Sequence, residues 1–236
     1  TQLDKFVLSG ILPLSEYGYF TLAVLVAGGI LQISVPISSA IMPRMARLQG
    51  EKKYQEVRDV YLGATQFVAV IVVTAGIVLA FLAKPVLYVW TGDVILANKA
   101  APILQLYSLG NAILALGAFP YYLQYAKGSL KYHFIGNLGS AILLIPAIIW
   151  AAENYGALGA GWVWLLIQSI YLIFWVSYVH IKLEPDLNVR WYASFLPSSL
   201  GVLCFIFLIS YFIIFSEQRF IAFLQIRSEE RRVGKE

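Results

Sequence analysis

The sequence predicts an all-α protein, a polytopic transmembrane helix bundle, on the basis of its composition and its long apolar runs. The chain has 236 residues, of which 60% are hydrophobic and only 13% are charged. Its mean hydropathy is +0.75. Soluble domains are about half apolar and about a quarter charged, so the surplus apolar surface here needs lipid to face. The short alternating segments that indicate a membrane β-barrel do not occur.

The long apolar runs set the number of spans, because a helix needs about 20 mainly apolar residues to cross a bilayer core. Residues 1–12 form a partial first span, and we expect the chain to be a fragment that lacks the start of this helix. Short polar turns between the later runs predict antiparallel neighbours in an up-and-down bundle. The complete spans are expected at residues 17–42, 61–82, 101–125, 134–152, 157–179 and 195–215.

The last ten residues, RSEERRVGKE (227–236), differ sharply from the apolar run before them. Seven of the ten are charged. They resemble the translated adapter sequence that contaminates some assembled genomes, and we interpret them as a non-native tail; a genuine solvated tail is the alternative. In either case we exclude them from the reasoning about the fold.

Charge in the connections predicts the orientation of the bundle. The connections at residues 44–58, 127–131 and 182–190 hold nine Lys or Arg, whereas the alternate connections together with Arg219 hold three. Since basic loops stay on the cytoplasmic side, we expect the first set to be cytoplasmic. The net charge of +4 therefore reflects topology, and it gives no reason to expect a nucleic-acid partner.

Motifs for enzyme chemistry are scarce. His133 and His180 stand near span ends without a matching cluster, and Cys204 is the only cysteine. No metal-ligand spacing, phosphate loop or nucleophile elbow occurs. We expect a protein that is not an enzyme and that needs no metal and no cofactor.

Polar residues inside the apolar runs carry more information, because charge in the hydrocarbon core is costly and is typical of functional positions. Asp4 and Lys5 are adjacent, so they point about 100° apart on a helix. Each is expected to face a wet cavity or a partner on another helix, unless both lie at the membrane edge and reach out to water. Amides such as Gln32 and Gln124 either link helices or line a polar interior. Prolines and glycines in the same runs favour a transporter that changes shape.

Three stretches resemble the second half of bacterial polysaccharide flippases. They are TQLDKFVLSGILPLSEYGYFTLA (residues 1–23), PISSAIMPRMARL (36–48) and VLYVWTGD (86–93). These flippases belong to the multidrug/oligosaccharidyl-lipid/polysaccharide exporter superfamily. The resemblance covers residues 1–215, and the first stretch is the most specific. Gly10 departs from it, because the family commonly has a basic residue there.

The resemblance implies a two-bundle, MATE-like fold in which this chain supplies the second bundle. Residues 1–182 would form that six-helix bundle with its first helix truncated, and residues 183–226 would add a C-terminal transmembrane helix. The implied function is translocation of undecaprenyl-diphosphate-linked oligosaccharide across the bacterial cytoplasmic (inner) membrane. The implied partners are this lipid-linked oligosaccharide, membrane lipid, a coupling ion (H⁺ or Na⁺) and other polysaccharide-assembly proteins.

The resemblance also suggests roles for the polar residues. Lys5 would offset the diphosphate charge, and Asp4 would orient Lys5 or couple an ion. Arg44 and Arg47 would be cytoplasmic anchors or would meet the diphosphate as it enters. Sugar hydroxyls would be bound by Gln2, Gln32 and Gln124. Two other functions stay open: a multidrug or cation antiporter of the same superfamily, and a membrane-embedded glycan polymerase.

Overall fold

The chain folds into helices throughout the part described by the computed structural model, which is residues 3–206 and residue 208. No strand occurs in this part, and five of its helices are long and apolar enough to cross a membrane. The predicted all-α transmembrane bundle is therefore confirmed. The chain divides into two compact units, Thr1–Pro197 and Ser198–Glu236, and the description below concerns the first.

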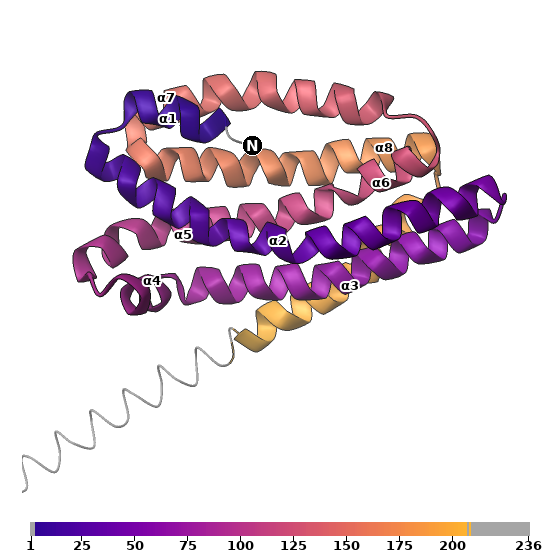
Figure 1. Ribbon diagram of the computed structural model, residues 1–236, viewed down its shortest axis with the longest axis horizontal. Coiled ribbons are helices and arrows are strands. Elements are labelled where there is room, and N and C mark those ends of the chain that lie inside the picture. The colour runs from indigo at the N-terminus through magenta and orange to yellow at the C-terminus, as the bar shows by residue number, and fades with distance from the viewer. Residues whose placement is uncertain (1–2, 207, 209–236) are drawn as a thin grey trace, which may run out of the picture. The chain divides into compact units, whose positions relative to one another are not determined.

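The helices follow one another with short connections (Figure 1). A further helix spans Leu187–Ile206. The elements before it are α1 (Leu3–Ile11), α2 (Leu14–Gly50), α3 (Tyr54–Phe81), α4 (Ala83–Thr91), α5 (Val94–Gly117), α6 (Phe119–Ala126), α7 (Lys131–Ile170), the π-helix η1 (Tyr171–Val176) and α8 (Ser177–Leu183).

The turn before α5 shows how local sequence sets the helix ends. Gly92 has φ 68 and ends α4 in the left-handed conformation that favours glycine. The next residue, Asp93, caps α5, because its carboxylate accepts hydrogen bonds from the backbone N–H groups of Ile95 and Leu96 at 2.8 and 3.0 Å. As a result α5 begins at Val94, and the predicted start at residue 101 was seven residues too late.

A single residue, Gly156, divides α7 into two arms. Its backbone has φ 62 and ψ −153, which lies outside the helical region and is accessible mainly to glycine. A Cβ atom at this position would lie 2.6 Å from Glu16 Oε1 of α2, so any other residue would also have to displace the Glu16 side chain. The two arms correspond to the predicted spans 134–152 and 157–179, and they run back alongside each other in Figure 1.

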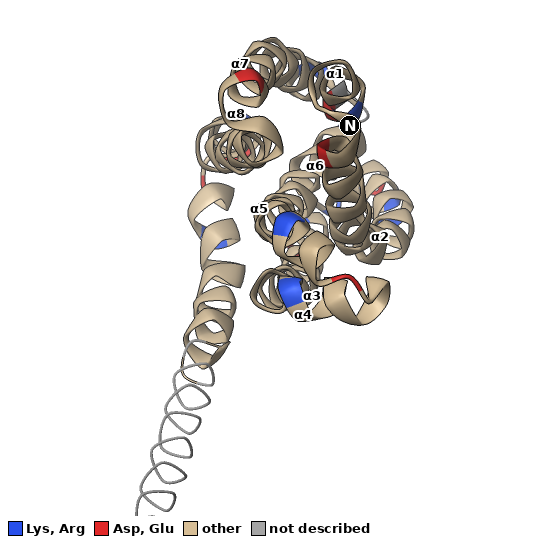
Figure 2. Ribbon diagram, turned by 90° about the vertical axis from the view of Figure 1, so that its left-hand side faces the viewer, with Lys and Arg blue, Asp and Glu red and all other residues tan. Residues whose placement is uncertain are grey.

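The burial pattern is that of a bundle surrounded by lipid. Helix α5 is buried on most of its surface and contacts α2, α3, α4 and α7. The outer helices expose large apolar side chains, among them Phe134 (70%) and Phe174 (68%). Charged residues are sparse along the described helices in Figure 2. In water such a surface would favour aggregation, whereas in a bilayer it faces acyl chains.

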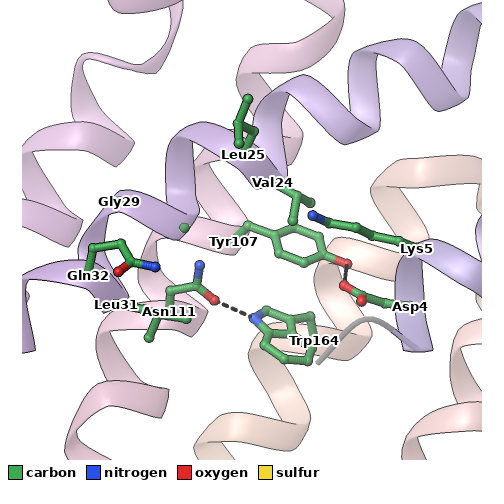
Figure 3. A pocket seen from close by; sticks show the side chains of 11 residues that line it. Asp4, Lys5, Val24, Leu25, Gly29, Leu31, Gln32, Tyr107, Asn111 and Trp164 are labelled. Atoms are coloured by element: carbon green, nitrogen blue, oxygen red, sulfur yellow. Dashed lines mark hydrogen bonds between the residues drawn. The ribbon is translucent and has the colours of Figure 1, made fainter. Parts of the chain in front are cut away.

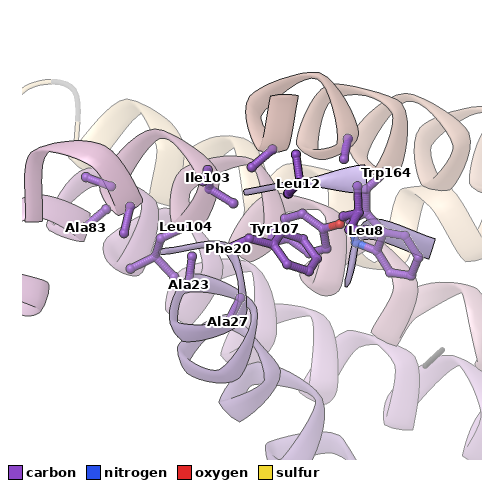
Figure 4. Close-up of a cluster of buried hydrophobic side chains, with 14 of the residues drawn as sticks. Leu8, Leu12, Phe20, Ala23, Ala27, Ala83, Ile103, Leu104, Tyr107 and Trp164 are labelled. Atoms are coloured by element: carbon purple, nitrogen blue, oxygen red, sulfur yellow. The ribbon is translucent and has the colours of Figure 1, made fainter. Parts of the chain in front are cut away.

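The core beside α5 is built on three aromatic rings (Figure 4). Phe20 of α2 packs edge-on against Tyr107 of α5 with 5.6 Å between ring centroids. Tyr107 stacks on Trp164 of α7 at 5.7 Å and an interplanar angle of 11°. Such pairs stabilise packing by about 0.5–1.5 kcal/mol each beyond area burial, and they fix α2, α5 and the second arm of α7 relative to one another.

The three basic connections lie at one end of the bundle, on the right in Figure 1. There Glu184, at the end of α8, accepts from Lys127 Nζ at 2.7 Å and also pairs with Arg58 of α3. Nearby, an ion pair of 2.9 Å joins Lys53 to Glu51, and the hydrogen bond from Lys53 lowers the pKa of Glu51 below its ordinary value. One carboxylate thus links all three connections that the sequence groups together.

A buried polar network joins α3, α8 and the helix that follows α8. His180 of α8 is fully buried, and its Nε2 lies 2.7 Å from the hydroxyl of Tyr61. Trp191 stacks edge-on against His180 at 4.9 Å and donates to Thr65 at 3.1 Å. These bonds satisfy polar groups that would otherwise lie unpaired in an apolar bundle.

The predicted last span, residues 195–215, needs correction at its start, because the helix begins at Leu187. Trp191 and Phe195 of this helix pack into the bundle. These contacts explain why the helix begins before the most apolar run of the sequence. The remainder of the predicted C-terminal helix and the tail at 227–236 lie outside the described residues.

Candidate functional site

A cavity of about 380 Å³ lies within the bundle and carries the charged residues of α1 (Figure 3). Helices α1, α2, α5 and the second arm of α7 form its wall. The residues around it are Asp4, Lys5, Val24, Leu25, Gly28, Gly29, Leu31, Gln32, Tyr107, Asn111 and Trp164. We call it the charged pocket.

Asp4 is the buried acid of the charged pocket, with 3% of its surface exposed. Its Oδ2 accepts a hydrogen bond from the hydroxyl of Tyr107 at 3.3 Å. Its Oδ1 is buried and has no hydrogen-bond partner among the described residues. A buried carboxylate oxygen without a partner is costly, so a proton, a cation or a donor from a ligand would stabilise Asp4.

Lys5 lines the same pocket and is half-buried. Figure 3 shows its ammonium directed toward Val24 and the ring of Tyr107, away from the carboxylate of Asp4. No ion pair of Lys5 is found within the described part of the chain. The two neighbours therefore do not pair with each other, as their angular separation on the helix predicts, and Lys5 remains available to an anion.

Neutral polar groups complete the wall opposite α1. Gln32 projects from α2 into the pocket, and Asn111 follows Tyr107 by one turn of α5. The Asn111 Oδ1 accepts a hydrogen bond from Trp164 Nε1 at 3.2 Å, which holds the indole ring in place. The amide nitrogens of Gln32 and Asn111 remain able to donate to a ligand hydroxyl.

Gln124 lies apart from the charged pocket, and its predicted role in sugar binding stays a prediction. Its Oε1 accepts from the backbone N–H of His133 at 2.8 Å, and its Nε2 donates to the Pro120 carbonyl at 3.2 Å. The first bond joins α6 to the start of α7, and the second lies within α6, so both ends of the amide have partners. Gln124 is 1% exposed and does not line the charged pocket.

Two other predicted site residues also lie apart from the pocket. Arg44 and Arg47 are exposed near the end of α2, at the basic end of the bundle. Arg47 Nε lies 3.7 Å from Glu51 Oε1, and the roles predicted for the two arginines stay predictions. Gln2 lies outside the described residues. Within them, no cluster of His, Cys, Asp and Glu has the arrangement to hold a metal ion.

Tyr107 and Trp164 were not predicted as site residues. Tyr107 stands near the middle of α5 and Trp164 about two turns past Gly156, whereas the aromatic residues expected as membrane anchors stand near span ends. An aromatic residue at mid-span beside an amide, as in the pair Tyr107 and Asn111, is the signal that identifies them.

Comparison with known proteins finds similarity to one family over part of the chain. Residues 1–97 match a family described as polysaccharide biosynthesis protein. The matched region contains α1 to α4 and therefore includes Asp4, Lys5 and Gln32. Neither the comparison with curated proteins nor that with solved structures gave a match. The match supports a role in polysaccharide synthesis or export for this multi-pass membrane protein.

Proposed function

We propose that the protein translocates undecaprenyl-diphosphate-linked oligosaccharide across the bacterial cytoplasmic membrane for polysaccharide export. The observation that carries this proposal is the charged pocket, which places Lys5 and Asp4 inside a membrane-spanning bundle. The similarity of residues 1–97 to polysaccharide biosynthesis proteins supports the class of substrate.

The chemistry of the pocket suits such a headgroup. A diphosphate is doubly anionic, and a cation at short range stabilises it far more in a low-dielectric site than in water. Lys5 supplies that cation, while the amides of Gln32 and Asn111 donate to sugar hydroxyls. Asp4, with one free carboxylate oxygen, takes up the coupling proton or Na⁺ and returns it when the headgroup leaves.

A cation or drug antiporter of the same superfamily is the second candidate. It is favoured by Asp4 and the stacked rings of Tyr107 and Trp164, because a buried acid and aromatic faces attract organic cations. Lys5 in the same pocket opposes it, because its positive charge repels a cation. Drug-resistance assays on cells that express the complete gene distinguish the two functions.

The substitution Lys5→Ala tests the proposal in cells whose surface polysaccharide depends on this gene. We expect loss of surface polysaccharide, with the protein still present in the membrane fraction, because the diphosphate loses its counter-charge. The matched control is Lys99→Ala, an exposed lysine in the first turns of α5, which should leave export unchanged. Normal export by the Lys5 variant would remove Lys5 from the mechanism.

A further inference from the structure

A second cavity, of about 460 Å³, lies between α5, α6 and the two arms of α7. Its volume falls within the range of small-molecule sites. Trp164 borders both cavities, so the two are neighbours. We call this cavity the neutral pocket, because none of its described lining residues is Asp, Glu, Lys or Arg.

The two pockets follow each other along the bundle. On α5 the charged pocket is lined by Tyr107 and Asn111, and the neutral pocket by Leu114 and Gly117. Seven residues of helix correspond to about 10 Å. The neutral pocket is therefore displaced toward the end of the bundle where the basic connections lie.

The wall of the neutral pocket combines aromatic faces with unused hydrogen-bonding groups. Tyr121 packs against His133 at 4.5 Å between ring centroids, and Asn137 Nδ2 lies 2.9 Å from His133 Nε2. Within the described chain, the amide of Gln168 and the hydroxyl of Tyr171 form no side-chain hydrogen bond, although both line the cavity. An amide and a phenol hydroxyl without partners can both bind hydroxyl groups of an occupant.

We propose that the neutral pocket binds an uncharged sugar ring of the lipid-linked oligosaccharide, while the charged pocket binds its diphosphate. The inference rests on the proposed function and divides the substrate between two sites. Trp164, Tyr121 and Tyr171 supply aromatic surface in the lining, against which a pyranose ring can pack. Gln168 and Asn137 donate to and accept from its hydroxyls, and the absence of charge in the lining matches a neutral ring.

The test compares the affinity of the complete gene product in detergent for two probes. One probe is undecaprenyl diphosphate, and the other is undecaprenyl diphosphate that carries a full oligosaccharide repeat. We expect Gln168→Leu to weaken binding of the sugar-bearing probe by about five- to tenfold, the loss of one or two net hydrogen bonds. Binding of undecaprenyl diphosphate should not change. Lys5→Ala should weaken binding of both probes.

Two further variants keep the test decisive. Gln66→Leu is the matched control, since Gln66 is exposed on α3 and lines neither pocket. Tyr171→Phe removes only a hydroxyl and decides the question if Gln168→Leu fails to fold, as judged by its elution and thermal melting. Wild-type affinity of both pocket variants for the sugar-bearing probe would overturn this inference alone. Failure of the wild-type protein to bind either probe would overturn the proposed function and this inference with it.

Discussion

Trp164 is the residue on which the arrangement of both pockets depends. Its indole stacks on Tyr107 and donates to Asn111, so two neighbours on α5 fix its orientation. Between them on α5 lies Gly110, where an added Cβ would come within 2.5 Å of Trp164 Cδ1. The glycine thus provides the space that lets the indole approach α5, where it borders both cavities.

Gly110→Ala should destabilise the protein by about 1–3 kcal/mol, because the new methyl group overpacks a rigid ring that cannot move away. Thermal unfolding in detergent measures this as a lower melting temperature. Gly63→Ala is the control, since nothing lies within 4 Å of a Cβ atom there. In that exposed helical position alanine should stabilise slightly, by up to about 1 kcal/mol. Equal melting temperatures for the two variants would contradict the assigned role of Gly110.

At the scale of the elements, Glu184 ties α8 to α3 and to the α6–α7 hairpin. Its side chain is only 10% exposed, while Lys127 and Arg58 are 21% and 37% exposed. The carboxylate therefore compensates two cations that lie partly out of water. Without it, Lys127 and Arg58 would face each other with like charge.

Glu184→Gln should accordingly lower the free energy of unfolding by about 1–3 kcal/mol, because it leaves partly buried cations without a counter-charge. Melting temperature at low ionic strength is the measurement. Glu51→Gln serves as the comparison, because Glu51 makes only exposed ion pairs, which contribute little to stability. A Glu184 variant that melts with the wild type would show that the cluster does not hold the three elements together.

At the scale of the whole bundle, the connections alternate between two ends. The connections that the sequence groups by positive charge share one end through Glu184, and the α1–α2 turn meets the bend of α7 at the other, where Glu16 lies beside Gly156. Since basic connections favour the cytoplasm, we expect the Glu184 end to face the cytoplasm and the Gly156 end to face outward.

Single-cysteine labelling checks this orientation. In a Cys204→Ser background, Asn154→Cys should react with a membrane-impermeant maleimide in intact cells, because Asn154 is exposed beside the outward bend. Ser129→Cys, in the exposed α6–α7 hairpin, should react only after the membrane is opened. The reverse pattern would invert the topology, and labelling of both from outside would contradict an odd number of crossings between them.

The predictable part of this fold is the part encoded locally. Apolar runs mark the helices, and Gly156 marks the bend between the two arms of α7. Both features are visible within a few neighbouring residues of the sequence. Contacts between distant residues left no such signal. The hydrogen bond from Tyr107 to Asp4 joins residues 103 positions apart, and Gln124 could not be distinguished from a cavity residue until its two hydrogen bonds in the hairpin were seen.

The start of α5, which follows the short helix α4, shows a second limit of prediction from sequence. The predicted span began at residue 101, after Lys99, because hydropathy measures preference for lipid and not for helix. The cap at Asp93 and the core contacts of Ala97 and Ala100 nevertheless begin the helix seven residues before the predicted start. Tertiary packing thus extended a helix that composition alone would have shortened.

The π-helix η1 is a wider turn that continues the second arm of α7, and the winding of the arm can change there. An α-helix turns about 100° per residue, so rewinding η1 as α-helix by even one residue would rotate everything beyond it by about that angle. His180 lies four residues past η1 and is bonded to Tyr61 of α3. Since His180 moves with everything beyond η1, such a rotation would have to break its hydrogen bond to Tyr61.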